Sequence, residues 1–552
     1  MGVEFRRRGG DECMIVLEQI KLPIGHTKEE LDTLVYKKLG AKKEDSIEYQ
    51  VLKRSIDARK KPDIFFVYKI KIVSDLRLKK YDKRHVCIVE DRPDYSFPEK
   101  ISGDIAKEKR PVVVGFGPAG MFASYLLARA GFCPIVLERG KDADTRQKDV
   151  ARFWETGELN EESNVSFGEG GAGTFSDGKL NTGIGSAQGR SEEVLKILVE
   201  HGAPESILID NKPHLGTDLL CEIVKSMRKE VIRLGGIVLF ESRFKSLIIK
   251  GGEIAGCVYE DLSTGKEIDI ETDNICLCTG HSARDTFYDL FSNGVEMIPK
   301  DFAVGIRIIH PQKVIDDYVY GISDPGIMER KGITAGDYKL TGKARDGRGV
   351  YSFCMCPGGF VVDSSSESGG VVVNGMSYSR RDSGFANSAI VATVSGRDFG
   401  TGLFDGLEFQ REMERMAFRT GNGLLPAQYY RDFADNIRSS GPGDISDRVR
   451  GRTVGADLNE ILPPYISGAI KDVMPEFGRR IRGFDADDAI CLGVETRTSS
   501  PVRILRGKDL MSDIPGLFPC GEGAGYAGGI TSAAVDGIRV AEVVAKRIVN
   551  RI

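Results

Sequence analysis

The sequence predicts an α/β protein in which a doubly wound domain carries an inserted domain and follows a small α+β domain. A short apolar strand, a glycine-rich turn and an apolar helix succeed one another from residue 111. A second strand, glycine turn and helix occupy the stretch from residue 517 onward. The long segment between these two patterns is rich in strands and loops before it becomes helical. We therefore expect a doubly wound unit interrupted by an insertion, with domains at 1–105, 106–300, 301–484 and 485–552.

Composition is that of an ordinary globular protein, with 552 residues, 41% apolar and 29% charged. A net charge of -4 and a pI near 6.0 give no reason to expect nucleic acid or an anionic membrane as the main partner. Eleven cysteines without framework spacing predict reduced thiols. No apolar signal segment follows Met1, so a cytoplasmic location and no membrane span are expected. Oligomeric state is not predicted.

The N-terminal unit, residues 14 to about 90, is expected to have strand–helix–strand–strand order. Thr27 and Glu30 have the spacing of a capping box that opens a helix reaching Leu39. The first thirteen residues are expected to be a disordered lead, with Met14 an alternative start. The expected strands are 14–22, 48–56 and 64–73.

After a linker at 91–110, rich in charges and marked by prolines, the chain is expected to form a strand–helix–strand unit. Its strands lie at 112–114 and 134–138, on either side of a helix that ends near Ala130. Further along, a helix is expected at 219–234, and strands are expected at 237–240, 246–249, 254–259 and 274–278. No internal repeat is present.

The strongest motif is the turn Gly115-Phe-Gly117-Pro118-Ala119-Gly120, placed directly between strand and helix. Gly115 permits the tight turn, Gly117 lets the backbone approach a pyrophosphate, and Gly120 allows close helix packing. Glu138 ends the next strand and can hold a ribose hydroxyl pair. Together these features predict a Rossmann-like dinucleotide fold.

Two other stretches, 168–173 and 523–528, have the same glycine spacing in different contexts. The first precedes no apolar helix, so we interpret it as a glycine loop. Its backbone N–H groups, at Gly171 and nearby, together with Ser176 and Lys179 suit a diphosphate. The second has strand and helix but no further strand, so it must serve a ligand already bound by the first motif.

These residues together resemble the two-dinucleotide-binding flavoprotein superfamily, over about 111–300 and 485–552. More narrowly, the stretches 168–180, 356–359 and 520–533 look like a bacterial family of FAD-utilizing dehydrogenases with an N-terminal extension. The resemblance implies that FAD lies extended across the doubly wound domain. It implies a cofactor and not a substrate.

The resemblance also implies roles for single residues. Glu138, with Arg139 beside it, would bind the adenosine ribose, and Phe244 or Lys245 would contact adenine through backbone atoms. The remaining implied cofactor contacts are Thr279 and Gly280 near the pyrophosphate, Gly521 and Glu522 at the ribityl end, and Gly529, Ile530 and Thr531 at the flavin pyrimidine carbonyl. Position 522 is Glu where the superfamily more often has Asp, which leaves its hydrogen bond open.

Three residues are candidates for catalysis. Cys356, in Cys354-Met-Cys356-Pro-Gly-Gly, could relay electrons or act as a nucleophile, although buried cysteines are also common as small apolar residues. His310 could exchange a proton near the flavin, although an isolated histidine is more often a structural residue. Arg307 could hold a substrate carboxylate, although a surface salt bridge is the commoner role for a single arginine. No ligand spacing for a metal is present, so no metal is predicted.

The function expected is that of an FAD-dependent oxidoreductase acting on an unidentified small molecule, with NAD(P)H as a possible transient donor. The alternative is a flavin-containing RNA-binding or RNA-modifying protein. It depends on the basic N-terminal unit, in which 53–61 is rich in Lys and Arg and Phe65, Phe66 and Tyr68 could stack on bases.

Overall fold

A computed structural model describes residues 13–42, 45–74, 81–90, 94–100, 110–181, 183, 188–438 and 440–551. The expected disordered lead lies outside the described residues apart from its last position. Most of the expected linker at 91–110 also lies outside them.

The N-terminal unit is an antiparallel sheet in the order β2-β3-β1-β4 with one helix packed on it. The Thr27 hydroxyl accepts from the Glu30 N–H, and the Glu30 carboxylate accepts from the Thr27 N–H, so the predicted capping box is confirmed. Strand β4 was not foreseen. The elements are β1 (Cys13–Pro23), α1 (Lys28–Leu39), β2 (Tyr49–Lys60), β3 (Asp63–Ile72) and β4 (Val86–Glu90).

Five short strands form a parallel sheet in the order β24-β11-β5-β6-β7, which confirms the predicted α/β class. Helices α2, α4, α5 and α13 cover one face, while α6 and an antiparallel sheet, β10-β9-β8, cover the other. Because β24 pairs with β11, the C-terminal segment returns to the first sheet as predicted.

The strands of this unit are β5 (Val112–Val114), β6 (Ile135–Leu137), β7 (Ile237–Leu239), β8 (Ser242–Lys250), β9 (Glu253–Asp261), β10 (Lys266–Glu271), β11 (Ile275–Leu277) and β24 (Leu517–Pro519). Its helices are α2 (Pro118–Arg129), α3 (Ala143–Thr156), α4 (Arg190–Glu200), α5 (Thr217–Arg233), α6 (Arg284–Ser292) and α13 (Ile530–Val549), with 3-10 turns η3 (Gly171–Phe175) and η4 (Glu205–Leu208).

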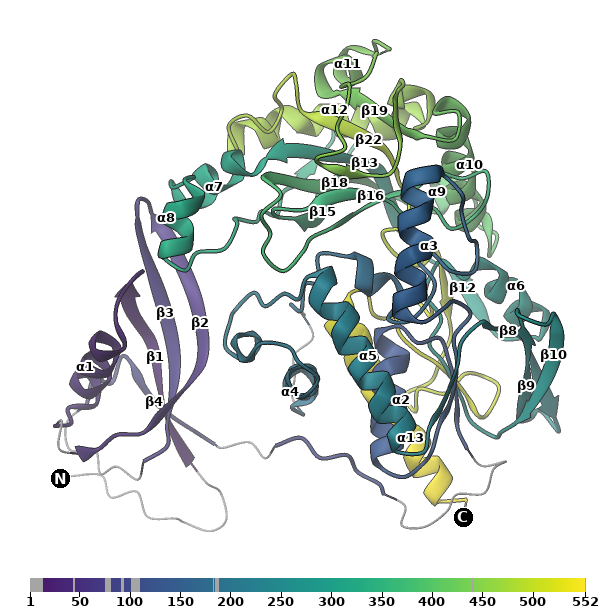
Figure 1. Ribbon diagram of the computed structural model, residues 1–552, viewed down its shortest axis with the longest axis horizontal. Helices are drawn as coiled ribbons and strands as arrows, with labels where there is room; N and C mark the ends of the chain where they lie inside the picture. The colour runs from purple at the N-terminus through teal and green to yellow at the C-terminus, as the bar shows by residue number, and fades with distance from the viewer. Residues whose placement is uncertain are drawn as a thin grey trace.

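The inserted domain, which we call the cap, lies above the parallel sheet in Figure 1. Its main sheet has the order β14-β15-β18-β13-β22-β19-β21, and a smaller one has the order β17-β16-β20. Strand β22 lies beyond the expected domain boundary at 484, yet it pairs with β13 and β19. This corrects the expectation that 485–552 returns at once to the parallel sheet, because the chain first completes the cap.

The strands in and beside the cap are β12 (Met297–Pro299), β13 (Phe302–Pro311), β14 (Thr341–Lys343), β15 (Gly349–Cys356), β16 (Phe360–Asp363), β17 (Val373–Met376), β18 (Phe385–Val394), β19 (Leu425–Tyr429), β20 (Val449–Arg450), β21 (Thr453–Gly455), β22 (Ile490–Glu495) and β23 (Val502–Ile504). The helices are α7 (Gln312–Tyr320), α8 (Pro325–Arg330), α9 (Gly396–Phe399), α10 (Asp405–Thr420), α11 (Tyr430–Asp435) and α12 (Pro464–Arg480), with a 3-10 turn η5 (Leu458–Glu460).

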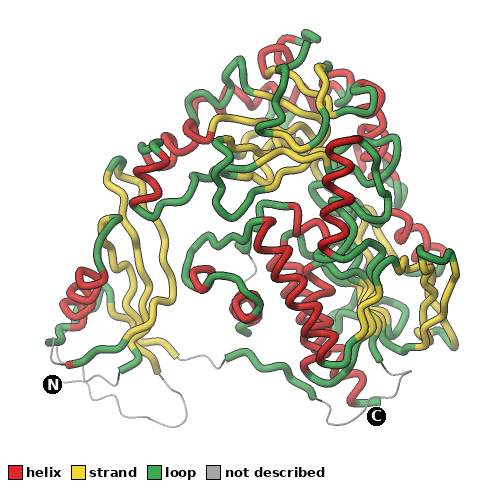
Figure 2. The backbone as a smooth tube through the Cα atoms, viewed as in Figure 1, coloured by secondary structure: helices red, strands yellow, loops and turns green. Residues whose placement is uncertain are grey.

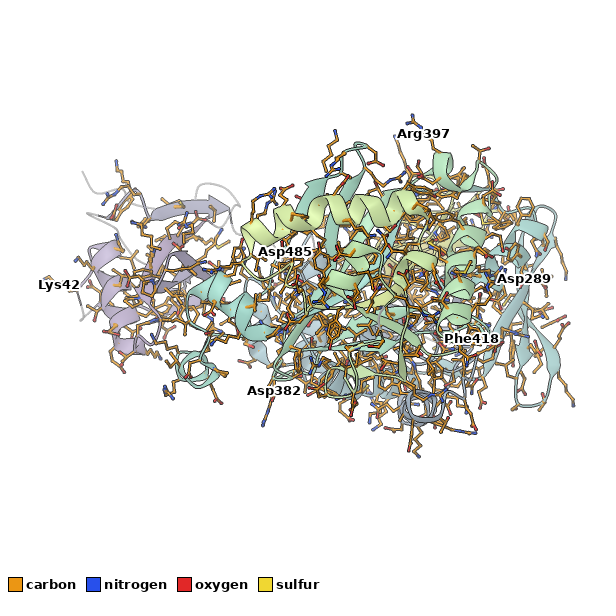
Figure 3. The ribbon with its side chains drawn as sticks, turned by 90° about the horizontal axis from the view of Figure 1, so that it is seen from above. Lys42, Asp289, Asp382, Arg397, Phe418 and Asp485 are labelled. Atoms are coloured by element: carbon orange, nitrogen blue, oxygen red, sulfur yellow. The ribbon has the colours of Figure 1, made fainter. Side chains whose placement is uncertain are left out.

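The N-terminal unit lies at one end of the molecule, where Figure 3 labels Lys42, and α6 lies at the other, where it labels Asp289. Figure 2 shows the strands of the N-terminal unit approaching the doubly wound unit and the cap. The Arg54 N–H donates to the Ile209 carbonyl at 2.6 Å, and its guanidinium pairs with Asp210 at 2.7 Å. Ile64 packs with apolar residues of α7 and α8. The unit is therefore docked on both the doubly wound unit and the cap.

Helices α2 and α13 lie side by side in Figure 1, and they approach closely because glycine occupies the contact. A Cβ on Gly537 of α13 would lie 2.1 Å from the Ala119 carbonyl oxygen of α2. A Cβ on Gly120 would lie 1.9 Å from the Gly115 carbonyl oxygen. Displacing the Ala119 oxygen would move α2, and displacing the Gly115 oxygen would move the turn after β5.

Replacing Gly537 by Ala is expected to destabilise the protein by about 1 to 3 kcal/mol, because the added methyl group overpacks a backbone contact. Gly468, inside α12, is the matched control, since a Cβ there meets no atom within 4 Å. Gly468→Ala should be neutral or slightly stabilising. Urea unfolding measures both variants, and equal effects would contradict the close packing of α2 and α13.

Candidate functional site

A cavity of about 480 Å³ lies between the glycine turn after β5 and the cap. Fifteen residues predicted as cofactor ligands lie in its wall: Gly115, Gly117, Pro118, Ala119, Glu138, Arg139, Gly171, Ser176, Lys179, Phe244, Thr279, Gly280, Glu522, Gly529 and Ile530. Gly120, Lys245, Gly521 and Thr531 do not line it. Residues far apart in the sequence thus meet at one place.

The glycine turn after β5 faces the glycine loop at 168–173, which runs into η3. Gly115 has φ +94, and a Cβ there would lie 2.7 Å from the Cys278 carbonyl oxygen. Gly171 has φ +61, and a Cβ there would lie 3.0 Å from the Gly117 Cα. Both positions therefore favour glycine, and the two backbones together form one wall of the cavity.

The Glu138 carboxylate orders both loops. It accepts from the Phe116 N–H at 2.8 Å, from the Gly140 N–H at 2.9 Å and from the Gly168 N–H at 3.0 Å. Glu138 also lines the cavity, and its oxygens retain acceptor capacity for a hydroxyl group. Arg139 beside it donates to Asp285 and stacks on Phe167, 4.2 Å from the ring centroid.

Arg146, which the sequence analysis missed, holds the glycine loop from behind. Its fully buried guanidinium donates to the carbonyls of Asn164, Val165 and Glu169 and to the Thr174 hydroxyl, each at 2.8 Å. No local sequence pattern marks this residue, because its partners lie 18 to 28 positions away.

Two helix N-termini without side-chain caps are directed at the cavity. Gly117 precedes α2 and Gly529 precedes α13, and neither terminus has a capping side chain. Free N–H groups and the helix dipole at such an end favour an anion. The site can therefore hold negative charge at two places.

One predicted contact near the start of α13 is corrected. The Gly521 N–H donates to the Asp536 carboxylate at 2.8 Å, and Asp536 is paired with Arg506, so this N–H is not directed at a ligand. The Thr531 hydroxyl donates to the Leu180 carbonyl at 2.8 Å, and the Lys245 ammonium lies 3.8 Å from Glu260. The contacts predicted for Thr531 and Lys245 involve their backbone, so these side-chain partners leave both predictions open.

Thr279 carries a buried hydroxyl in the cavity wall with no hydrogen-bond partner among the described residues. Leaving such a group unsatisfied is unfavourable, so it marks where a ligand atom fits. Next to it, Gly280 presents open space at its Cβ position. This part of the wall is shaped for a polar ligand.

The cap supplies the opposite wall through Phe353, Cys354, Asn374, Glu495, Arg497 and Thr498. Arg307 lies fully buried behind this wall and does not line the cavity. Its guanidinium donates to Glu495 at 3.0 Å and to the Cys354 carbonyl at 3.2 Å. Arg307 therefore positions the wall, which corrects its expected contact with a substrate.

The two other expected catalytic residues also lie outside the cavity wall. Cys356 is fully buried, and it is Cys354 that lines the cavity. His310 is fully buried, and its Nε2 lies 2.7 Å from the Phe484 carbonyl oxygen. Burial lowers the pKa of His310 to about 4. A neutral histidine packed in the cap core cannot reach a ligand in the cavity.

Carboxyl groups in the wall are shifted toward neutral pH. Although about a third of the Glu522 side chain is exposed, partial burial followed by the nearby Cys354 raises its pKa to about 7. Burial also raises the pKa of Glu495 to about 7, against the opposing effect of Arg307. His281, whose Nε2 lies 3.9 Å from Glu522, has its pKa lowered to about 3 by burial and nearby arginines. Both carboxyl groups can exchange protons near neutral pH.

Among the described residues, no group of three or more His, Cys, Asp and Glu side chains could hold a metal ion. In the same part of the chain, no helix has both the length and the apolar character needed to cross a membrane.

Comparison with known proteins identifies a relative from Clostridium beijerinckii, described as an uncharacterized protein. It is 45% identical over 539 residues, which cover 96% of this chain and 98% of that protein. This chain belongs to the same family as the clostridial protein.

Two domain families also match parts of this chain. Residues 301–498 match the family "FAD-dependent protein, C-terminal domain-like", and residues 14–73 match a domain of unknown function. The first match includes β22, in agreement with its pairing in the cap.

Solved structures of flavoproteins show distant similarity. A glycerol-3-phosphate dehydrogenase from Bacillus halodurans complexed with FAD is 12% identical, with a TM-score of 0.34, over 81% of this chain and 64% of that chain. The E. coli quinol fumarate reductase is 12% identical, with a TM-score of 0.37, over 82% and 72%. At these scores the similarities add nothing to the site described above.

An ion-pair network joins the cap to the doubly wound unit beside the cavity. Glu414 of α10 accepts from Arg284 of α6 at 2.8 Å and from Arg497 at 2.9 Å. Burial by itself would raise the pKa of Glu414, but these two guanidinium groups hold it well below its usual range. The network fixes Arg497 in the cavity wall.

Replacing Glu414 by Gln is expected to lower the free energy of unfolding by about 3 to 5 kcal/mol at pH 7, because two buried arginines lose the carboxylate that they share. Since the folded pKa of Glu414 is depressed, its contribution is present above the unfolded value of about 4.3 and is lost as the pH falls. The variant should therefore lose part of the acid dependence of unfolding.

Glu412→Gln on the same helix is the control, since Glu412 is 60% exposed in a surface pair with Arg419. Denaturant unfolding measures the stability of both variants between about pH 3 and about pH 7, the range in which carboxyl groups titrate. Identical acid profiles for Glu414→Gln and the unmodified protein would refute this role.

Proposed function

We propose that this protein binds FAD in the cavity and is an FAD-dependent oxidoreductase. The observation that carries the proposal is one continuous wall formed by Glu138, the turn at Gly117, the uncapped N-terminus of α13 and the Thr279 hydroxyl, which has no partner in the described part of the chain. A dinucleotide needs these groups in this combination: a ribose acceptor, a pyrophosphate cradle and a polar contact between them. The FAD-dependent domain family that matches the cap supports the assignment.

In this proposal Glu138 and the backbone at Phe244 bind the adenosine end, and Gly115 to Ala119 bind the pyrophosphate. Gly529 and Ile530, at the start of α13, would bind the flavin end and stabilise negative charge there, by about 0.3 to 1 kcal/mol for a helix terminus. When bound, FAD supplies two-electron chemistry with a substrate held against the cap.

The chain's own residues would then bind and orient that substrate. Asn374 offers an amide and Arg497 a fixed cation, while Glu495 and Glu522 can each take or give a proton near pH 7. The cap covers these groups, which limits access of water. Reduced pyridine nucleotide remains a proposed electron donor.

The RNA-directed alternative gains no support from the described residues. Phe66 and Tyr68 are buried in the N-terminal core, so they cannot stack on bases. Arg54 is paired with Asp210 of the doubly wound unit. Absence of salt-sensitive RNA retention by the full chain would be consistent with this interpretation.

Purified protein is expected to be yellow and to release FAD on heat denaturation. Replacing Thr279 by Val should weaken FAD binding by about 0.5 to 1.5 kcal/mol, roughly two- to tenfold in Kd, without destabilising the cofactor-free protein. Thr498→Val is the control, since the Thr498 hydroxyl bonds Ala303 within the cap. That variant should lose stability with or without FAD.

Release of FMN, or a colourless protein that FAD does not reconstitute, would contradict the proposal. Unchanged FAD affinity in Thr279→Val would show that this hydroxyl does not contact the cofactor. Fluorescence titration of the refolded flavin-free protein measures the affinity.

Anaerobic titration of flavin absorbance with NADH, NADPH and a panel of metabolites tests the oxidoreductase assignment. Bleaching by at least one of them is expected, because a bound flavin needs an electron donor. A flavin that chemical reductants bleach but no metabolite bleaches would contradict an enzymatic role.

A further inference from the structure

Two thiols lie one behind the other in the cap wall of the cavity. Cys354 is partly exposed and lines the cavity, whereas Cys356 is fully buried. The pairing of β15 with β18 is irregular between Phe353 and Cys356, and Cys354 has a left-handed φ of 44°. Such a conformation is uncommon for a non-glycine residue and clusters at functional sites.

This local irregularity turns the buried thiol back toward its neighbour. The Cys356 Sγ donates to the Cys354 carbonyl at 3.3 Å, and each thiol affects the pKa of the other. The Cys356 sulfur therefore lies beside Cys354, where a side-chain rotation can bring the two sulfur atoms into contact. Only one of them is accessible from the cavity.

Two cations lie beside the exposed thiol. Arg307 donates to the Cys354 carbonyl, and the Lys179 ammonium donates to the Met355 carbonyl. The neighbouring Cys356 and, after it, these cations lower the pKa of Cys354 against the opposing effect of burial.

Acidic groups oppose this effect. Asp177 raises the pKa of Cys354, and Cys354 in turn raises the pKa of Glu495 in the same wall and of Glu522 at the α13 side of the cavity. Asp177 is itself paired with Lys179 and Arg381, at 2.7 and 2.6 Å. The pKa of Cys354 is lowered in spite of these acids, whereas burial raises the pKa of Cys356.

We propose that Cys354 and Cys356 form a redox-active thiol pair whose substrate is a small disulfide entering the cavity. The proposal uses the same cavity as the proposed function but not its cofactor, so either can fail alone. Cys354 is the attacking thiol and Cys356 the resolving one.

The exchange takes place in two steps. The Cys354 thiolate attacks one sulfur of R–S–S–R, forms a mixed disulfide and releases R–S⁻, which takes a proton from water. The Cys356 thiol then attacks the Cys354 sulfur, the Cys354–Cys356 bond forms, and R–SH leaves with the Cys356 proton. The pair loses two electrons, and the substrate disulfide gains them. A dithiol reverses the exchange.

The test treats the full-length protein, as purified, with 2-hydroxyethyl disulfide, blocks the remaining thiols with N-ethylmaleimide after denaturation, and maps tryptic peptides by mass spectrometry. The peptide that begins after Arg348 should lose two hydrogens and escape alkylation, and dithiothreitol should restore it. Cys356→Ser should stop at a mixed disulfide on Cys354. Cys354→Ser should form neither product.

The pair Cys276 and Cys278 is the internal control, since it has the same spacing and lies on a separate tryptic peptide. Cys276 is buried in β11, and burial raises its pKa, while Cys278 follows the strand as a buried residue that also borders the cavity. Their peptide should stay fully alkylated. Full alkylation of Cys354 and Cys356 as well, or reaction at both pairs alike, would overturn the proposal.

Flavin content measured on the same samples separates the two hypotheses. A Cys354→Ser protein that keeps its FAD but forms no disulfide supports both proposals. A flavin-free protein that still forms the Cys354–Cys356 disulfide would leave the thiol pair standing and remove the proposed cofactor.

Discussion

The close approach of α2 and α13 is the contact on which the site depends. Gly120 and Gly537 remove the side chains that would separate these helices from neighbouring backbone. Because the helices are adjacent, their uncapped N-termini face one cavity, although some 400 residues separate Gly117 from Gly529 in the sequence. A larger residue at either glycine would displace one terminus, and the anion-binding geometry would be lost with it.

Charge pairing then fixes the cap above this cavity. Glu414 joins Arg284 of the doubly wound unit to Arg497 of the wall, and Arg307 joins Glu495 to the Cys354 backbone. Buried ion pairs of this kind contribute less to stability than to holding the joined groups in one defined arrangement. For this chain that is a hypothesis, and the Glu414 variant tests it. The wall is rigid where it is charged, so its groups hold their positions before a ligand enters.

The N-terminal unit contacts both other units, through Arg54 at the doubly wound unit and through Ile64 at α7 and α8. Its basic character is partly neutralised by such pairs. The same holds inside the site, where Lys179 lowers the pKa of Cys354 while its partner Asp177 raises it. In both places the electrostatic effect of a charged residue depends on which partner the fold places beside it.

The sequence by itself determined the parallel sheet, the capping box at Thr27, the glycine turn with Glu138 and the return of β24. These depend on local backbone geometry, on periodicity and on connectivity, which neighbouring residues specify. Only the tertiary structure decided that Cys354 rather than Cys356 lines the cavity, that His310 lies in the cap core, and that Gly521 donates to Asp536. Each of these depends on a strand irregularity or on a partner distant in the sequence. No local sequence pattern predicts which distant residue becomes the partner in the folded chain.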